Sequence, residues 1–180
     1  RGGGDVQVSG GNATAGGELS AVIYSTGTIS VCGLTGTSAL AEAAVVEGAN
    51  SVSATSSELT GGTHGAYMYS STPGNTGGGT FTMSGGTLTA KDGNAVFVDG
   101  VSAAINLSNA AKLDPGAGAL ISVSNNGSAS ASLQETVLEG QLTADAGSTL
   151  SVSLTANSRI TGTLSNVGLE LDNTSTVDLT

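Results

Sequence analysis

The sequence lacks tryptophan, has one cysteine and two prolines, and contains only 3% aromatic residues. Charged residues make up 10% of the chain, and its four lysines and arginines are outnumbered by fourteen aspartates and glutamates, which gives a net charge of -10. Nucleic acids and anionic membrane surfaces both require clustered basic side chains. We therefore expect no nucleic-acid partner, and we interpret the negative charge as a contribution to solubility.

The single cysteine, Cys32, excludes a disulfide bond within the chain. Because it follows the apolar residues Ile29 and Val31, we expect a buried small apolar side chain rather than a reactive thiol. No run approaches the roughly 18 apolar residues of a membrane-spanning helix, so we expect no membrane span in this segment. The chain begins at Arg1 without an initiator methionine or a signal peptide, which predicts a fragment of a longer secreted polypeptide.

The composition is dominated instead by small residues, with 29 glycines and many serines, threonines and alanines. Valine, leucine and isoleucine recur among them, and the mean hydropathy is +0.17. Disordered chains are poor in aliphatic residues and rich in charge or proline. The composition therefore predicts an ordered chain with a narrow core and with glycine and serine at its corners.

Residues 80–100 show the repeating unit most clearly. Three apolar segments, Phe81/Met83, Leu88 and 95–98, are separated by Gly-Gly and Asp-Gly-Asn corners. Each segment has the composition of a strand, and the corner residues tolerate a positive φ. Three short strands cannot enclose a core, but they form one turn of a coil whose core is completed by neighbouring turns.

Two markers extend this unit along the chain. An apolar pair recurs at spacings of 23, 23, 29, 24, 26, 19 and 19 residues. These pairs are Val6/Val8, Ile29/Val31, Val52/Ala54, Phe81/Met83, Ile105/Leu107, Ala131/Leu133, Leu150/Val152 and Leu169/Leu171. A second marker begins at Ala21, Ala44, Ala66, Ala95 and Ala119, and it lengthens in the same unit. We predict an all-β fold, a single parallel β-helix (β-solenoid) domain over residues 1–180, with about eight rungs of roughly 19–29 residues.

Two irregularities interrupt the repeat. Residues 70–79 insert turn-forming residues between two strands, and we expect them to form a loop on one face. Rung length changes near 122–132, and Gly140 and Gly162 then follow at a 22-residue spacing, so we expect the coil to continue with a different cross-section. Residues 34–47 alone have a helix-forming composition, but they match the second marker, and we interpret them as coil plus strand.

Alternation along each strand predicts which side chains enter the core. The residues expected to point inward are Val6, Val8, Ile29, Val31, Phe81, Met83, Ile105, Leu107, Leu150 and Val152, with Val22, Val45, Val96 and Phe97 in the third ladder. The run 95–98 is apolar on both faces, so the sequence leaves open whether Val96 or Phe97 points inward. Tyr67 and Tyr69 cannot both point inward with Met68, and outward they would form an aromatic patch.

Several tracts carry a family resemblance: Gly-Gly-Thr-Leu-Thr-Ala-Lys-Asp-Gly-Asn-Ala-Val-Phe-Val at 85–98, Ala-Ile-Asn-Leu-Ser-Asn-Ala-Ala-Lys-Leu at 104–113 and Ser-Leu-Thr-Ala-Asn-Ser-Arg-Ile-Thr-Gly-Thr-Leu at 153–164. In repeat style, residues 50–180 resemble the adhesin-like, pectate-lyase-type right-handed parallel β-helix proteins of bacterial surfaces, including autotransporter passengers. A tryptophan common after the last corner of that family is missing here. The resemblance implies a right-handed coil and an extracellular or cell-surface location, and it carries no catalytic signature.

Polysaccharide lyases and hydrolases share this fold, and they place carboxylates of neighbouring rungs beside a basic side chain. Here Asp92 and Asp99 come nearest to such a pair, one rung from Asp114, with Lys91 and Lys112 close by. The tracts Asp-Gly-Asn and Asp-Pro-Gly that contain two of these carboxylates are typical of turns. Because fold alone does not confer function, we expect no enzyme, and a divergent polysaccharide lyase or hydrolase is the alternative.

Other catalytic and metal-binding patterns are incomplete. The Gly-His-Gly and Arg-Ile-Lys tracts of polygalacturonases correspond only to Thr-His-Gly at His64 and to Arg-Ile-Thr at Arg159. No second histidine or cysteine stands at ligand spacing from His64. Asp92, Asn94 and Asp99 could offer oxygen ligands to calcium, but the nonapeptide of calcium β-rolls is absent. We therefore expect no metal and no cofactor.

Threonine pairs such as Thr87/Thr89 raise the third possibility of an ice-binding solenoid, in which outward threonines stack across rungs. The adjacent units are expected to place these residues beside the pair: Glu58/Thr60 and Lys112/Asp114. Such an array would be one rung wide. Outward threonine is also common in ordinary strands, so we do not expect an ice-binding surface.

These patterns favour a non-catalytic adhesive or structural rod of a bacterial surface protein, in which loop 70–79 presents recognition elements. The candidate binding residues are Tyr67, Tyr69, Pro73 and Asn75, and the candidate partners are a glycan or a host or neighbour-cell surface protein. An uncapped solenoid end exposes unpaired backbone groups and an apolar cross-section. Association end to end into homo-oligomers or filaments is therefore a further hypothesis.

Overall fold

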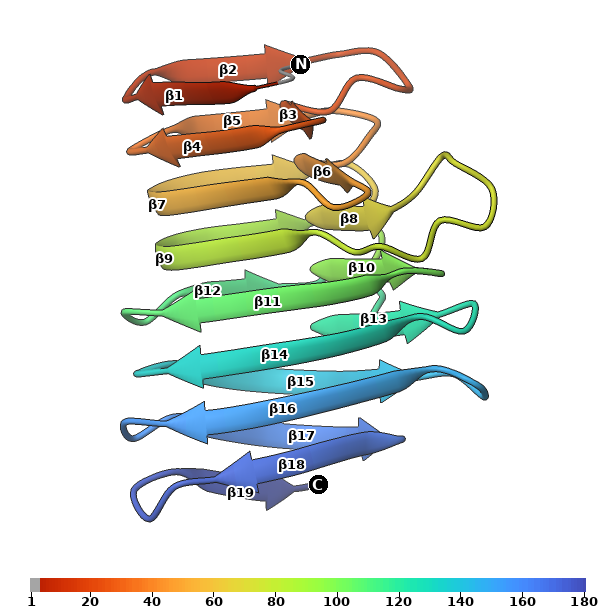
Figure 1. Ribbon diagram of the computed structural model, residues 1–180. Coiled ribbons are helices and arrows are strands. Elements are labelled where there is room, and N and C mark those ends of the chain that lie inside the picture. Colours follow the sequence, from red (N-terminus) through yellow and green to blue (C-terminus); the bar gives the residue numbers. More distant parts are fainter. Residues whose placement is uncertain (1–3) are drawn as a thin grey trace.

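The computed structural model describes residues 4–180, which form nineteen β-strands and no helix (Figure 1). The strands are β1 (Asp5–Ser9), β2 (Asn12–Ala15), β3 (Ile23–Ser25), β4 (Thr28–Cys32), β5 (Thr35–Ser38), β6 (Ala44–Glu47), β7 (Ser51–Gly61), β8 (Ala66–Tyr69), β9 (Thr80–Ala90), β10 (Val96–Asp99), β11 (Ser102–Ser108), β12 (Lys112–Asp114), β13 (Ile121–Ser124), β14 (Ser128–Gln134), β15 (Val137–Ala144), β16 (Thr149–Thr155), β17 (Arg159–Ser165), β18 (Val167–Leu171) and β19 (Thr176–Leu179). The described chain thus offers no helix that could cross a membrane.

The strands stack into two long parallel sheets. The first follows the order β1-β4-β7-β9-β11-β14-β16-β18, and the second the order β3-β6-β8-β10-β13-β15-β17-β19. A shorter ladder of β2, β5, β12 and the second halves of β7 and β9 forms a further wall of the N-terminal rungs. Seen from the N-terminal end, the chain runs clockwise as it recedes (Figure 1). The fold is therefore a right-handed β-solenoid. The repeat predicted the solenoid with about eight rungs, and the structure has about 7 turns.

Strand alternation places the first marker in the core of the inner rungs, as predicted. In the terminal strands β1 and β18, by contrast, Val6, Val8 and Leu171 are exposed, because no further strand of the described chain covers them. Ile29, Phe81 and Ile105 lie in one parallel register, and all three are buried. One pair was placed wrongly. The partners of Ala131 and Leu133 are Val152 and Leu154, rather than Leu150 and Val152. Leu150 is also buried, because residues two apart share a face, so composition alone did not distinguish the two registers.

The second marker correctly predicts a ladder of strands, but the alanines that define it are not aligned with one another. Ala44 pairs with Ile23, and Ala66 pairs with Val96, so neither Ala21 nor Ala95 occupies the predicted position. What stacks is the inward side chain, whatever its size, rather than the alanine. In the same ladder we expected Val45 to point inward, and Phe97 was one of two residues between which the sequence did not choose.

Phe97 and Val45 point outward. In β10, Val96 and Val98 are buried in the core, so the intervening Phe97 lies on the outer face. In β6, Ala44 and Val46 enter the core, and Val45 faces out, in register with Tyr24 and Tyr67. Because the side-chain period is two, each strand offers its core only alternate residues of an apolar run.

Cys32 is exposed, in contrast to the predicted burial. It ends β4, whose burial alternates so that Ile29 and Val31 enter the core. The residue after Val31 must then point outward. Apolar neighbours in the sequence were therefore a misleading signal for this residue.

The two irregularities lie where the sequence placed them. Residues 71–77 are exposed and form a loop between β8 and β9, which projects from the coil in Figure 1. Gly140 and Gly162 pair with each other, at φ values of 148° and 145° that favour glycine. β15 and β17 continue through these glycines, and each of the C-terminal rungs has two strands. Residues 34–47 contain β5 and β6, in agreement with their interpretation as coil plus strand.

Candidate binding site

All three tyrosines and one of the two phenylalanines gather on the outer face of the second sheet. The parallel register places Tyr24, Tyr67 and Phe97 in one outward row, with Val45 between the two tyrosines. Tyr69 lies two residues beyond Tyr67 on the same face. These aromatic side chains come from three of four successive rungs, and each is partly buried.

The rings are stacked against one another. Tyr67 and Tyr69 lie 4.8 Å apart between ring centroids with an interplanar angle of 3°. Phe97, from the next rung, lies 5.6 Å from Tyr67 at 10°, and His64 lies 4.9 Å from Phe97 at 36°. Such offset aromatic pairs stabilise by about 0.5–1.5 kcal/mol beyond the area they bury. The patch is therefore a rigid surface rather than a set of independent side chains.

Each tyrosine hydroxyl takes part in a hydrogen bond. Tyr24 donates to Oε2 of Glu47 at 2.6 Å, and its hydroxyl lies 2.7 Å from that of Tyr69. Tyr67 donates to Oδ2 of Asp99 at 2.8 Å. Burial, and then these hydrogen bonds, raise the pKa of both Tyr24 and Tyr67 above the usual range of tyrosine. The hydroxyls of Tyr24 and Tyr67 therefore remain protonated donors.

The second oxygen of each carboxylate is also occupied. Nδ2 of Asn125 donates to Oδ1 of Asp99 at 2.5 Å. The Ser71 hydroxyl donates to Oε1 of Glu47. Asp99 is thus held from two rungs, and Ser71 ties the inserted loop to the sheet.

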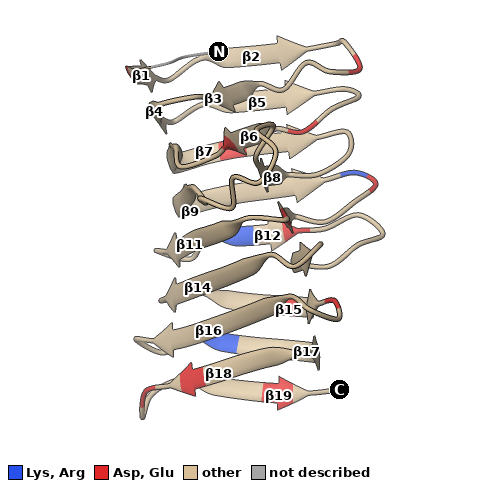
Figure 2. Cartoon of the chain, turned by 45° about the vertical axis from the view of Figure 1, so that its right-hand side comes forward, with Lys and Arg blue, Asp and Glu red and all other residues tan. Residues whose placement is uncertain are grey.

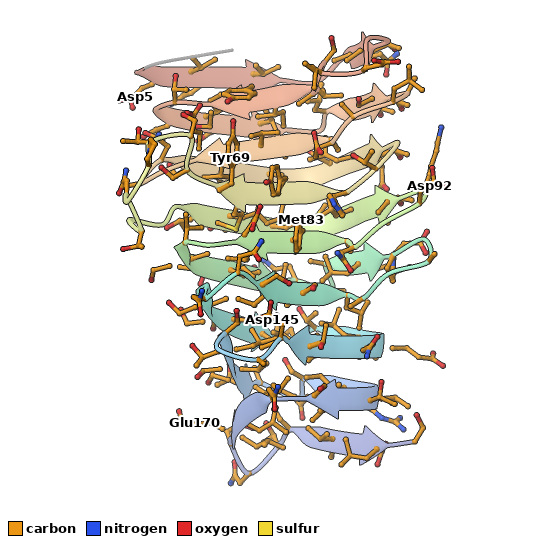
Figure 3. All side chains as sticks on the ribbon, turned by 90° about the vertical axis from the view of Figure 1, so that its right-hand side faces the viewer. Asp5, Tyr69, Met83, Asp92, Asp145 and Glu170 are labelled. Atoms are coloured by element: carbon orange, nitrogen blue, oxygen red, sulfur yellow. The ribbon has the colours of Figure 1, made fainter. Side chains whose placement is uncertain are left out.

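A hollow of about 270 Å³ opens between the inserted loop and the corner that follows β10. It is lined by Tyr69, Ser70, Thr72, Pro73, Gly74, Asn75, Thr76, Asp99, Gly100 and Val101. Figure 3 shows Tyr69 on this face, close to the loop. Tyr67 stacks on the Tyr69 ring, and Tyr69 is the aromatic residue that lines the hollow.

The base of the loop is fixed by close backbone packing. A Cβ atom on Gly78 would lie 0.6 Å from the carbonyl oxygen of Ser102, and the Ser102 N–H donates to the carbonyl of Thr76 at 2.9 Å. Nearer the tip, Oδ1 of Asn75 accepts a hydrogen bond from the N–H of Gly77 at 2.9 Å. The exposed loop therefore has a defined shape although it carries no strand.

The structure brings most of the predicted binding residues together. Tyr69, Pro73 and Asn75 line the hollow, whereas Tyr67 lies behind Tyr69 and holds Asp99. Both tyrosines point outward, as an aromatic patch requires, since Met68 between them is fully buried. Sequence reasoning missed Asp99 as a lining residue, because the preceding run 95–98 is apolar on both faces and did not decide which of its residues point outward.

The carboxylates considered for catalysis do not converge. Asp92 lies in the corner before β10, and Figure 3 shows it at the opposite edge of this face from Tyr69. The corner of Asp114 stacks below that of Asp92, with the N–H of Gly116 donating to the carbonyl of Gly93 at 3.1 Å. Asp99, after β10, lies instead at the hollow. The basic residues shown in Figure 2 lie at Lys91, at Lys112 in β12 and at Arg159 in β17, outside the hollow.

His64 belongs to the aromatic patch. Its Nδ1 accepts a hydrogen bond from the N–H of Asn94 at 3.0 Å, which requires that this nitrogen carry no proton. Burial lowers the pKa of His64 below its usual value, and the charge of Glu42 opposes this shift. The neutral form is therefore the one that fits the patch.

The threonine array is longer than predicted in one row. Glu58/Thr60 and Lys112/Asp114 do flank Thr87/Thr89, as expected. The pair Thr87/Thr89 is therefore one rung wide, as predicted, although a single outer row of threonines continues through these residues: Thr14, Thr37, Thr60 and Thr89. The companion row is broken by the charge of Glu58, so paired threonines occupy only some of the levels.

Between residues 4 and 180, no group of three or more histidine, cysteine, aspartate or glutamate side chains is placed to hold a metal ion. Comparison of the chain with protein-family models, with curated proteins and with solved structures finds no match. The hollow, the aromatic patch and the shape of the coil are therefore the features of this chain that bear on its function.

Proposed function

We propose that this chain is a non-catalytic adhesive rod of a bacterial surface protein, which binds a glycan in the hollow between Tyr69 and the inserted loop. The observation that carries the proposal is this hollow, lined by an aromatic ring, a proline, a carboxylate, an amide and hydroxyl groups. Binding sites for small ligands commonly combine apolar walls with a few oriented polar groups. An extracellular or cell-surface location follows from the resemblance in repeat style and is part of the same proposal.

The ligand class follows from the lining. The Tyr69 ring, which lines the hollow, offers a flat apolar surface to the C–H face of a sugar ring, and the Asp99 carboxylate accepts hydrogen bonds from sugar hydroxyls. The volume of about 270 Å³ suits one or two sugar residues. A host or neighbour-cell surface protein that carries such a glycan is the corresponding physiological partner.

Rigidity is the contribution of the fold. Tyr67 and Asp99 are fixed on strands of successive rungs, and the base of the loop is packed into the stack. A preorganised site loses less conformational entropy on binding than a mobile one. A parallel solenoid thereby presents the site at a constant distance along a rod.

The proposal is tested with a glycan array and with binding to intact cells. We expect Tyr69→Ala to reduce binding about tenfold or more, because it removes the stacking surface. Thr143→Ala is the matched control, since Thr143 faces out on the same sheet but does not line the hollow. Failure to bind any glycan or cell, or equal binding by Tyr69→Ala, would contradict the proposal. Polysaccharide turnover abolished by Asp92→Ala would overturn the non-catalytic assignment.

A further inference from the structure

The hollow beside Tyr69 carries a negative charge held in place by neutral donors. Asp99 accepts hydrogen bonds from the Tyr67 hydroxyl and from Nδ2 of Asn125, one at each carboxylate oxygen. Both donors are uncharged, so they orient the carboxylate without cancelling its charge. The ion pair formed among the described residues joins Arg159 to Asp178, on another part of the rod.

The other groups around the hollow add no positive charge. Its lining contains no lysine, arginine or histidine. Oδ1 of Asn75 already accepts from the Gly77 N–H, which leaves the amide NH₂ group as a donor for a ligand. The whole chain carries a net charge of -10, so the surrounding field favours cations and opposes anions.

We propose that the hollow selects glycans that carry a free amino group, with Asp99 binding the ammonium and Tyr69 stacking on the sugar ring. This inference rests on the proposed glycan-binding function and narrows its ligand class. An ammonium group gains a charge-assisted hydrogen bond with Asp99 that a neutral hydroxyl or acetamide group cannot match. The electron-rich face of Tyr69 is attractive to the same cation. Acidic glycans, such as uronic acid polymers, meet repulsion from Asp99.

Tyr67 and Asn125 are positioning residues in this arrangement. Neither residue lines the hollow, and both act on the ligand only through Asp99. Removing the Tyr67 hydroxyl therefore weakens the orientation of the carboxylate and leaves its charge. Tyr67→Phe is expected to lose part of the affinity while its dependence on salt concentration stays that of the original chain.

The test compares glucosamine oligomers with N-acetylglucosamine oligomers of equal length by isothermal titration at mildly acidic pH. We expect the amino form to bind at least about tenfold more tightly, since hydrogen bonds to charged groups exceed those to neutral ones. Raised salt should reduce this preference. Asp99→Asn should abolish the preference for the amino form. Asp114→Asn, which removes the same charge from an exposed position of β12, should keep this preference.

Each other outcome overturns the inference. Equal binding of the two oligomers, or a preference that survives in Asp99→Asn, shows that Asp99 does not select an ammonium group. Equally tight binding of a lysine tetramer shows that the sugar ring contributes nothing. These results leave the proposed function standing if other glycans bind through Tyr69, whereas loss of all glycan and cell binding removes both. Circular dichroism of each variant confirms that the coil is intact.

Discussion

The two phenylalanines of this chain lie on opposite sides of the solenoid wall. Phe81 is 0% exposed in the core, between Val52 and Ile105 of the adjacent rungs. Phe97 lies on the outer face, against Tyr67 and His64. Both are aromatic residues in apolar strand segments, yet one supports the fold and the other supports the candidate site.

This difference predicts different costs of truncation. Phe81→Ala leaves a cavity that the stacked strands cannot close, and we expect a loss of about 3–5 kcal/mol in the free energy of unfolding. Phe97→Ala should cost clearly less, because its ring is partly in contact with water in the folded state. Chemical denaturation of both variants measures the difference. Equal losses would contradict the assignment of the two faces.

Cys32 provides a second check of side-chain direction. Because its side chain is exposed, we expect it to react with a thiol reagent in the folded protein at a rate close to that of the denatured chain. The matched control is Val31→Cys combined with Cys32→Ser, since Val31 is 3% exposed. That variant should react only after unfolding. Protection of Cys32 in the native state would place it inside the core instead.

His64 makes stability depend on pH. Its pKa is lowered in the folded state, so the unfolded chain binds the proton more readily. The contribution of His64 is therefore fully present above the unfolded pKa of about 6.5 and is lost as the pH falls below it. Comparing melting temperatures at neutral and acidic pH, we expect a smaller acid-induced decrease in His64→Gln than in the original chain. An identical decrease in both would rule out this linkage.

At the scale of elements, the rungs and the inserted loop follow different rules. A rung is determined by its inward ladder, in which each strand pairs with equivalents above and below. The loop is determined at its base, where Gly78 and Gly79 approach the backbones of neighbouring rungs. Its exposed tip can vary without disturbing the stack, as is usual for loops on solenoids.

Two glycine substitutions test this division. Gly78→Ala places a Cβ atom 0.6 Å from the Ser102 carbonyl oxygen, so we expect a large loss of stability or failure to fold. Gly74→Ala, at the tip, meets no atom within 4 Å and should cost only about 1 kcal/mol, because its φ is 76°. Thermal unfolding compares the two variants. Similar stability for both would show that the loop base is not packed as described.

At the scale of the whole molecule, the ends differ from the sides. β1 and β18 each pair with a neighbour on one side only. Val8 at the first rung is 39% exposed and Leu179 at the last is 68% exposed, although both occupy core positions of the repeat. We propose that, in a protein that consists of residues 1–180 alone, these surfaces allow two copies to associate end to end.

This proposal predicts association that depends on concentration. Light scattering should detect oligomers at high concentration, and Val8→Lys should suppress them by placing a charge in the apolar end. The control is Val137→Lys, because Val137 is exposed on the side of the rod. A monodisperse monomer at every concentration, or equal effects of both variants, would count against end-to-end association.

The sequence by itself determined the coil. Apolar residues with period two, separated by glycine corners and repeated at similar spacings, admit few folds other than a stacked parallel solenoid. The inserted loop, the outward direction of Tyr67 and Tyr69, and the pairing of Gly140 with Gly162 followed from the same pattern. These features are local or repeated, so they leave a signal in the chain.

Only the tertiary structure decided the register between rungs and therefore the site. A shift of one residue exchanges the two faces of a strand, and the run 95–98 is apolar enough to permit either choice. Pairing of Val96 with Ala66 turned Phe97 outward and set Asp99 beside Tyr69. Residues far apart in the chain, such as Tyr24 and Tyr69 or Tyr67 and Asp99, meet at the patch through that register alone. No local pattern encodes it, because it results from the packing of all rungs together.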